Sequence, residues 1–288
     1  MSAFPKLNAF QLKRIALVCM TLDHLASFGF EIPVFAALYT PLRIVGRIAA
    51  PVFLFLLVQS TRHTQSRQRF LLRLYLAGVC VGLFTTATNF FLGEIIGYST
   101  PGNIIFTFFY TVLYIHLAEM FLDAIRHRRW KKILLPLLLF ALSLLPNLLY
   151  FQRMLPGDAP FRYQMLVEDL RDSFLPSTRW GNVTSYGLPF VVLGVVMYFF
   201  KTPKRQTWVF ATFCLLCVLG TGLAVFFPAV YRLPDTSTYF NSFQPWMVLA
   251  LPFLCLYNGE KGGGNKWFFY VYYPAHRYII RVIASFFV

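Results

Sequence analysis

Long apolar runs recur along the whole chain, separated by short clusters of charged and polar residues. Each run is about 20 residues long, the length that a helix needs to cross the hydrocarbon core of a bilayer. We therefore expect an all-α fold, a polytopic membrane helix bundle of about nine transmembrane helices. The predicted spans are residues 11–30, 41–60, 71–92, 103–124, 132–151, 183–200, 207–228, 240–257 and 267–288.

Composition and charge agree with a membrane protein. Hydrophobic residues make up 58% of the chain and charged residues only 13%, whereas about 25% of a soluble domain is charged. A net charge of +15 would suggest nucleic-acid binding in a soluble protein. Here the positive residues lie mainly in alternate loops, which is the positive-inside pattern. We therefore predict the lipid bilayer, and no nucleic acid, as a partner, with the N-terminus cytoplasmic and the C-terminus external.

The spans leave little room for anything else, so residues 1–288 are predicted to form a single integral membrane domain. The longest connection, residues 152–182, is expected to be external. It contains the stretch RYQMLVEDLRDSFL, whose apolar residues recur at helical spacing, at Met165, Leu166, Leu170 and Phe174. This spacing predicts an amphipathic helix that either rests on the membrane surface or covers a cavity.

The cysteines predict neither disulfides nor a metal or redox site, and the N-terminus does not predict a cleaved signal peptide. All five cysteines lie within apolar runs, so no disulfide framework is implied. Cys214 and Cys217 form a CxxC motif without a second pair, which favours small core residues over a metal or redox site. No metal is expected. The first apolar run resembles a signal peptide, but its length and its Asp-His pair favour an uncleaved first span.

The first two spans carry ionisable residues that a bilayer disfavours. Asp23 and His24 lie toward the far end of the first span, and Arg43 and Arg47 lie near the start of the second. In a helical hairpin all four fall at about the same depth. Each such residue costs a few kcal/mol to insert, so it normally faces a partner or a wet cavity. We therefore predict a polar site in the outer half of the membrane.

Each of these four residues has two interpretations. His24 titrates near neutral pH and is the candidate general base. Asp23 lies about 100° from it around the helix, so it is better placed to neutralise Arg47 across the hairpin. Arg43 and Arg47 share a helix face and could hold a phosphate or carboxylate. The alternative is a purely structural polar cluster, with Arg43 extended toward the interface.

Three further positions could contribute to the site. Lys13 precedes His24 by eleven residues, about three helical turns, so it faces the same side nearer the cytoplasm. It could meet an anionic cofactor or simply anchor the helix. Asn103 and Thr107 lie one turn apart at the start of the fourth span, where they could line a site or bond neighbouring helices.

The last span contains a second polar cluster. His276 follows Pro274 well inside the span, with Arg277 beside it. Tyr270 and Tyr273 lie about one to two turns earlier and could share the face of His276. A proline at membrane depth leaves a carbonyl free and favours a kink beside a cavity.

Several stretches in order resemble the TraX family of membrane proteins. They are KRIALVCMTLDH followed by LRIVGRIAAPVFLFLLV, then GNIIFTF at 102–108, and LYNGEKGGGNKWFFYVYYPAH at 256–276. The resemblance spans almost the whole chain, but residues 152–182 have no counterpart. The chain is similar in a looser sense to transmembrane acyltransferases, which place a basic residue and a histidine about three turns apart. Lys13 and His24 have this spacing, although arginine is usual at the first position.

The resemblance implies an acetyltransferase of a bacterial inner membrane, with acetyl-CoA as donor. The TraX family is associated with conjugation and with N-acetylation of pilin, so the implied acceptor is a peptide amine, as at a pilin N-terminus, or a hydroxyl of an envelope glycan. The implied catalytic residues are Asp23, His24 and His276. The implied substrate-binding residues are Lys13, Arg43, Arg47, Asn103, Thr107, Asn258, Tyr270 and Tyr273.

Two other functions are compatible with the same charges. A transporter or channel could use them as a substrate path, although no internal repeat is evident. A non-catalytic component of a secretion or conjugation machine could use them only to hold its helices together. A transporter predicts flux across vesicles without acetyl-CoA, and a structural component predicts that swapped charges retain function.

Overall fold

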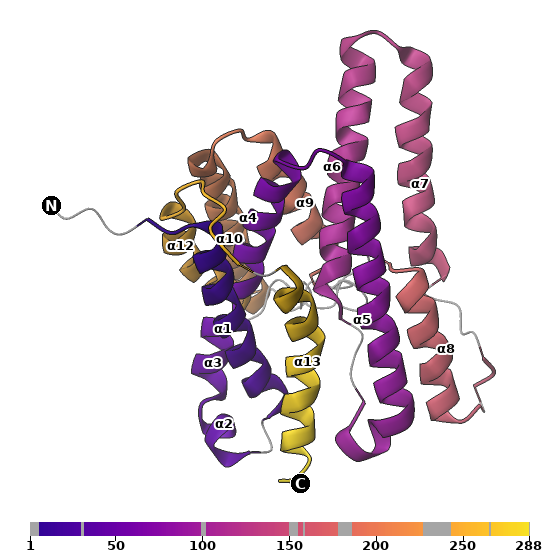
Figure 1. Ribbon diagram of the computed structural model, residues 1–288, viewed down its shortest axis with the longest axis vertical. Coiled ribbons are helices and arrows are strands. Elements are labelled where there is room, and N and C mark those ends of the chain that lie inside the picture. Colours follow the sequence, from indigo (N-terminus) through magenta and orange to yellow (C-terminus); the bar gives the residue numbers. More distant parts are fainter. Residues whose placement is uncertain are drawn as a thin grey trace, which may run out of the picture. The chain divides into compact units, whose positions relative to one another are not determined.

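The computed structural model describes residues 6–29, 32–98, 102–149, 155–157, 159–177, 186–226, 243–264 and 266–287 (Figure 1). Within these ranges the chain is helical, and the one extended pairing is an isolated parallel bridge between Leu7 and Tyr257. The chain divides into two compact units, Met1–Gln59 with Val196–Val288, and Ser60–Val195.

Each of the nine predicted spans contains a helix, so the predicted all-α fold is confirmed. In chain order these helices are α1 (Ala9–Phe28), α3 (Tyr39–Gly46) with α4 (Ala49–Arg62), α5 (Arg67–Ile96), α6 (Ile104–Arg126), η1 (Trp130–Ile133) with α7 (Leu134–Leu149), α9 (Gly187–Phe199), α10 (Pro203–Phe226), η3 (Gln244–Ala250) with α12 (Leu251–Cys255), and α13 (Lys266–Ala284). Two short helices lie between spans, α2 (Pro33–Ala37) and α8 (Phe161–Phe174).

Five helices of the described chain are long and apolar enough to cross a membrane, so the protein is a polytopic membrane protein. They are Tyr39–Arg62, Arg67–Ile96, Ile104–Arg126, Trp130–Leu148 and Pro203–Leu223, and two shorter apolar helices are Gly187–Phe199 and Gln244–Cys255. The first and last predicted spans fall outside this set. They are the most polar of the nine, because α1 carries Lys13, Arg14 and Asp23, and α13 carries Arg277 and Arg281.

The unit Met1–Gln59 with Val196–Val288 holds α1 firmly at its start. Asn8 caps α1 through a reciprocal pair of hydrogen bonds with Gln11. The glycine-rich segment before α13 lies against this cap: Ala9 N donates to Glu260 O at 2.8 Å. Gly262 has φ 67° there, and a Cβ on it would lie 2.5 Å from the Asn8 side chain. At Gly262 a side chain would therefore clash with the start of α1.

The unit Ser60–Val195 is built around α5 and α6. The Phe106 ring packs against Val79 and against Gly78, where a Cβ would lie 2.4 Å from the ring. Tyr110, Tyr114 and Leu117 of α6 form a second core cluster with Val191 of α9.

Helix α8 packs against α5 through polar residues. Asp169 is buried, and its Oδ2 accepts a hydrogen bond from Asn89 Nδ2 at 2.8 Å. Ser173 lies so close to Gly82 that a Cβ there would be 2.4 Å from the Ser173 hydroxyl. Residues 152–182 thus contain a helix whose buried residues are Asp169, Asp172 and Ser173, whereas Phe161, Tyr163 and Phe174 are exposed.

We expect Asp169 to make the stability of the protein depend on pH. Burial raises the pKa of this carboxyl from 3.8 to about 6, against the opposing hydrogen bond from Asn89. The folded state therefore binds the proton more tightly than the unfolded state, so stability falls as pH rises from about 4 to about 6, by on the order of 2 kcal/mol. Asp172, whose pKa burial also raises, acts with the same sign.

The variant Asp169→Asn keeps a hydrogen-bonding partner for Asn89 and removes this titration. Its melting temperature in detergent should fall less than that of the wild type between pH 4 and pH 6. Glu94→Gln, at an exposed position of α5, should follow the wild-type profile. A profile of Asp169→Asn as steep as the wild type would contradict the assignment.

Candidate functional site

Two adjacent residues of α1 face two different neighbours in the same unit. Asp23 turns toward α3, and His24, about 100° further around the helix, turns toward α13. Figure 1 shows α1, α3 and α13 running beside one another. Helix α1 therefore connects an ion-pair cluster on one side with a histidine pair on the other.

Asp23 binds both predicted arginines. Its Oδ1 accepts hydrogen bonds from Arg43 Nη1 at 3.0 Å and from Arg47 Nη2 at 2.6 Å. Arg47 also donates to the Oε1 atom of Gln244 at 3.3 Å, and Asp23, Arg47 and Gln244 are all buried. The predicted pairing across the hairpin is confirmed. Charge-assisted bonds of this kind offset part of the cost of burying the charges.

A glycine makes this close approach feasible. Gly46 precedes Arg47, and a Cβ on Gly46 would lie 2.3 Å from Asp23 Cβ and 2.5 Å from Asp23 Oδ1. No side chain fits between the two helices at this point. The LRIVGR sequence of α3 thus supplies both the partners of Asp23 and the space for it.

The two histidines meet although 252 positions separate them in sequence. His24 Nδ1 lies 2.5 Å from His276 Nε2, and the rings are stacked with centroids 4.8 Å apart. His276 Nδ1 lies 2.7 Å from the carbonyl oxygen of Tyr272. The hydroxyl groups of Tyr272 and Thr21 are 2.8 Å apart and join the same two helices.

This geometry determines the tautomer of both neutral histidines. A carbonyl oxygen only accepts, so His276 Nδ1 carries the proton that it donates to Tyr272. The other nitrogen of His276, Nε2, is then an acceptor, and His24 Nδ1 must donate to it. The remaining nitrogen, His24 Nε2, keeps its lone pair. The arrangement therefore presents an oriented proton acceptor on α1.

Aromatic rings surround the histidine pair. The Tyr272 ring stacks on His276 at 5.0 Å between centroids, and Tyr273 lies at 6.2 Å. On the other side, the Phe28 ring lies 5.3 Å from His24. Tyr273 thus joins His276 as predicted, whereas the side chain of Tyr270 lies outside the described part of the structure.

Lys13 and Asn258 belong to the same unit but lie nearer the start of α1. The Lys13 ammonium lies 5.6 Å from the centre of the Phe269 ring of α13, so Lys13 and His24 face the same helix, as predicted. Asn258 forms a turn with Glu260: its side chain donates to the Glu260 carboxylate and accepts from the Glu260 N–H, both at 2.9 Å. Its backbone N–H donates to Leu7.

Asn103 and Thr107 belong to the unit Ser60–Val195. Asn103 caps α6 and donates to Gly78 O at 2.9 Å. Thr107 is fully buried, and its carbonyl accepts from the Thr111 hydroxyl at 2.8 Å. Their described contacts lie within that unit and not with the histidine pair, and they are those of helix packing.

Comparison with known protein families assigns the chain to one of them. The TraX protein family model matches residues 9–153 and 178–284. The chain belongs to the TraX family. The match leaves out residues 154–177 and with them α8, which agrees with the lack of a TraX counterpart for that segment. All the residues of the histidine and ion-pair clusters lie within the matched ranges.

A protein named for fimbrial assembly aligns with nearly the whole chain. The "Probable fimbrial assembly protein FimC, serogroup H1" of Dichelobacter nodosus is 27% identical over 276 residues, which cover 93% of this chain and 92% of that protein. No solved structure matches the chain.

Sequence reasoning missed several residues of this TraX-family site. No spacing or charge pattern indicated a role for them, although Gln244 opens the eighth span and Tyr272 precedes His276 by one helical turn. The missed residues are Thr21, Phe28, Gln244, Tyr272 and Arg281.

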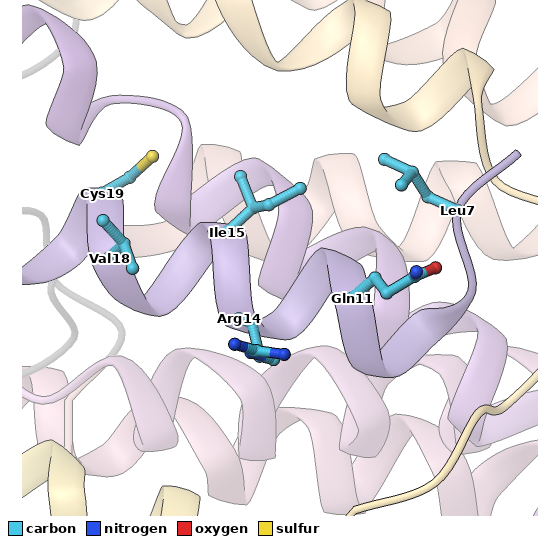
Figure 2. A pocket seen from close by; sticks show the side chains of 6 residues that line it. All are labelled: Leu7, Gln11, Arg14, Ile15, Val18 and Cys19. Carbon is cyan, nitrogen blue, oxygen red and sulfur yellow. The ribbon is translucent and has the colours of Figure 1, made fainter. Parts of the chain in front are cut away.

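The third face of α1 borders an open pocket of about 460 Å³ (Figure 2). It is lined by Leu7, Gln11, Arg14, Ile15, Val18 and Cys19. No residue of the histidine or ion-pair clusters lines it, so the pocket and the polar chemistry lie on different faces of the helix.

We expect the contact between Asp23 and α3 to control the stability of this unit. Asp23→Asn removes the carboxylate that buried Arg47 and half-buried Arg43 share and should cost about 3–5 kcal/mol. Gly46→Ala places a methyl group into the space of Asp23 and should cost about 1–3 kcal/mol. Both should lower the melting temperature in detergent.

Gly222→Ala in α10 is the matched control, because a Cβ there meets nothing within 4 Å. It should leave stability unchanged or raise it by up to about 1 kcal/mol. A Gly46→Ala protein as stable as Gly222→Ala would show that the α1–α3 approach is not tight.

Proposed function

We propose that this TraX-family protein is a membrane-embedded acetyltransferase that moves an acetyl group from acetyl-CoA to an amine or hydroxyl of an acceptor. The observation that carries the proposal is the hydrogen-bonded series from Tyr272 O through His276 to His24. It orients His24 Nε2 as a base, and a positioned base is what attack on a thioester requires.

The reaction needs only one base and one donor for the oxyanion. The acceptor nitrogen or oxygen attacks the thioester carbonyl carbon, and its proton passes to His24 Nε2. The C–S bond then breaks, the thiolate of CoA leaves, and it recovers the proton from His24. His276 is the positioning residue, because its bond to His24 Nδ1 stabilises the imidazolium between these steps.

Arg43 is the proposed donor to the developing oxyanion. Asp23 fixes its guanidinium through Nη1, and its buried Nε has no hydrogen-bond partner among the described residues. An oriented cation is effective at such a position because it needs no rearrangement during the reaction. Arg47, bonded to both Asp23 and Gln244, holds Arg43 and its partner in place.

The protein is proposed to lie in a bacterial inner membrane, and acetyl-CoA is proposed to reach the site from the cytoplasmic side. The positive-inside pattern supports a cytoplasmic N-terminus, and Lys13 lies on that side of His24 and faces the same helix. Lys13 would attract the phosphate groups of acetyl-CoA. The relative from Dichelobacter nodosus is named as a fimbrial assembly protein, which favours a peptide amine such as a pilin N-terminus over an envelope glycan as acceptor.

We expect His24→Ala to lower acetyl transfer by about 10²–10⁴-fold, the usual contribution of a general base. His276→Ala should lower it less, because His24 keeps its own lone pair. The measurement is transfer of label from radioactive acetyl-CoA to peptide and glycan fractions in sealed vesicles of defined orientation. His127→Ala, at an exposed histidine, is the control and should transfer at the wild-type rate.

Each other outcome bears on the proposal. Full activity of a folded His24→Ala protein would remove His24 from the mechanism. No transfer by the folded wild type to any peptide or glycan would favour the transporter or the non-catalytic component.

A further inference from the structure

We propose that Tyr272 of α13 is a second positioning residue for proton transfer by His24, and that it acts through the bond between its hydroxyl group and Thr21 of α1. The inference rests on the acetyl-transfer function proposed above, because it concerns the base of that reaction. The hydrogen-bonded series that carries that function uses only the backbone carbonyl of Tyr272 and gives its side chain no role.

The bond between the two hydroxyl groups has a definite direction. The Thr21 hydroxyl lies 2.9 Å from the carbonyl oxygen of Leu17, one turn earlier in α1, and donates to it. A hydroxyl group has one hydrogen to donate and two lone pairs with which to accept. Thr21 therefore accepts from Tyr272, whose hydroxyl oxygen is 2.8 Å away. The side chain of Tyr272 is thus held on α1 by a bond in which Tyr272 is the donor.

Within the described chain, the ring of Tyr272 belongs to a series of neighbouring rings that passes from α13 to α1. Phe268, Tyr272 and His276 follow one another at intervals of four residues, so they share a face of α13. Their neighbouring ring centroids are 5.4 Å and 5.0 Å apart. His24 and Phe28 of α1 continue the series, with centroids 4.8 Å from His276 to His24 and 5.3 Å from His24 to Phe28.

Within this series, Tyr272 is the ring that orients His276. The interplanar angle is only 9° between Tyr272 and His276, and it is 19° between His276 and His24. The torsion that turns such a ring has a broad range unless something restrains it. Because Thr21 holds the far end of the Tyr272 ring, that ring presents a fixed surface to His276. His276 is then held both by this surface and by its bond to the Tyr272 carbonyl.

The orientation of His276 matters because it determines where the lone pair of His24 points. His24 Nδ1 and His276 Nε2 are 2.5 Å apart, and a hydrogen bond between them weakens as soon as either ring turns out of alignment. His24 could then turn its Nε2 atom away from the acceptor. Even a small misplacement of a reacting group slows the chemical step. The Tyr272 hydroxyl therefore acts on the rate of that step and not on the binding of substrate.

Tyr272→Phe tests this role most directly, because it removes the hydroxyl, keeps the ring, and leaves Thr21 donating to Leu17. It should lower kcat for acetyl transfer about 3–10-fold, the net contribution of one hydrogen bond, and leave KM for acetyl-CoA unchanged. Thr21→Val leaves the Tyr272 donor without its acceptor and should lower kcat further. The double variant should recover the kcat of Tyr272→Phe, because no donor is then left unsatisfied.

Two matched controls separate this contact from general effects of the substitutions. Tyr163→Phe removes a hydroxyl from an exposed residue of α8. Thr212→Val removes a hydroxyl that donates to the carbonyl four residues earlier in α10, as that of Thr21 does in α1. Both should transfer acetyl groups at the wild-type rate. A purely structural role of Tyr272 would lower the yield of folded protein and leave kcat per folded molecule unchanged, which would overturn the proposal.

A second measurement does not depend on acetyl transfer. NMR chemical shifts of isotopically labelled imidazole nitrogens distinguish a nitrogen that carries a proton from one that has a lone pair. They are recorded on full-length protein in detergent at about pH 8, where free histidine is neutral, and the His24 signal is identified by its loss in His24→Ala. In the wild type His24 should carry its proton on Nδ1 alone, and in Tyr272→Phe it should show a mixture of both tautomers.

The two measurements keep this inference apart from the proposed function. Either a wild-type kcat or an unchanged His24 signal in Tyr272→Phe overturns the positioning role of Tyr272, while acetyl transfer by the wild type stands. If the folded wild type transfers no acetyl group, the proposed enzyme fails by itself. The His24 signal alone then decides whether Tyr272 orients His24: a mixture of tautomers in Tyr272→Phe supports it, and an unchanged signal removes it.

Discussion

The carboxylate of Asp23 is the interaction on which the first unit depends. It lies in an apolar helix, where an unpaired charge would be costly, and it holds two guanidinium groups through one oxygen. This requirement explains why α3 has a glycine at Gly46 and why α1 and α3 approach so closely. Because the ion pairs fix the rotation of α1 about its axis, they also determine that His24 faces α13.

The polar groups of α13 orient the imidazole of His24, which faces them. His276 donates to the carbonyl oxygen of its own helix, at Tyr272, and thereby leaves Nε2 to accept from His24. The hydroxyl groups of Thr21 and Tyr272 join the same helices one turn away. The histidine pair is thus held in one tautomer by backbone as well as by side chains, and this makes it suited to moving protons in a fixed direction.

Local patterns predicted most of the fold and half of this site. Apolar runs of span length predicted the helical segments of all nine spans, because a spanning helix must satisfy its backbone internally. The pairing of Asp23 with Arg47 followed from a hairpin with matched depths. The TraX resemblance suggested His276 as a partner of His24, but no local pattern specifies that their helices meet across 252 positions. The contact of α8 with α5 did not follow from the spacing of its apolar residues, because Asp169 bonds to Asn89 and Ser173 lies against Gly82.

The residues of the site also explain why α1 and α13 are the most polar of the predicted spans. An isolated helix with Asp23 or with Arg277 and Arg281 would enter a bilayer at a cost of a few kcal/mol for each charge. In the folded unit Asp23 is bonded to Arg43 and Arg47, and the Arg277 guanidinium lies over the Phe28 ring of α1. Assembly of the helices and assembly of the site are therefore the same event in this unit. The histidines, which are neutral in the tautomers described, can be replaced without removing a charge that the assembly requires, so their variants can separate chemistry from folding.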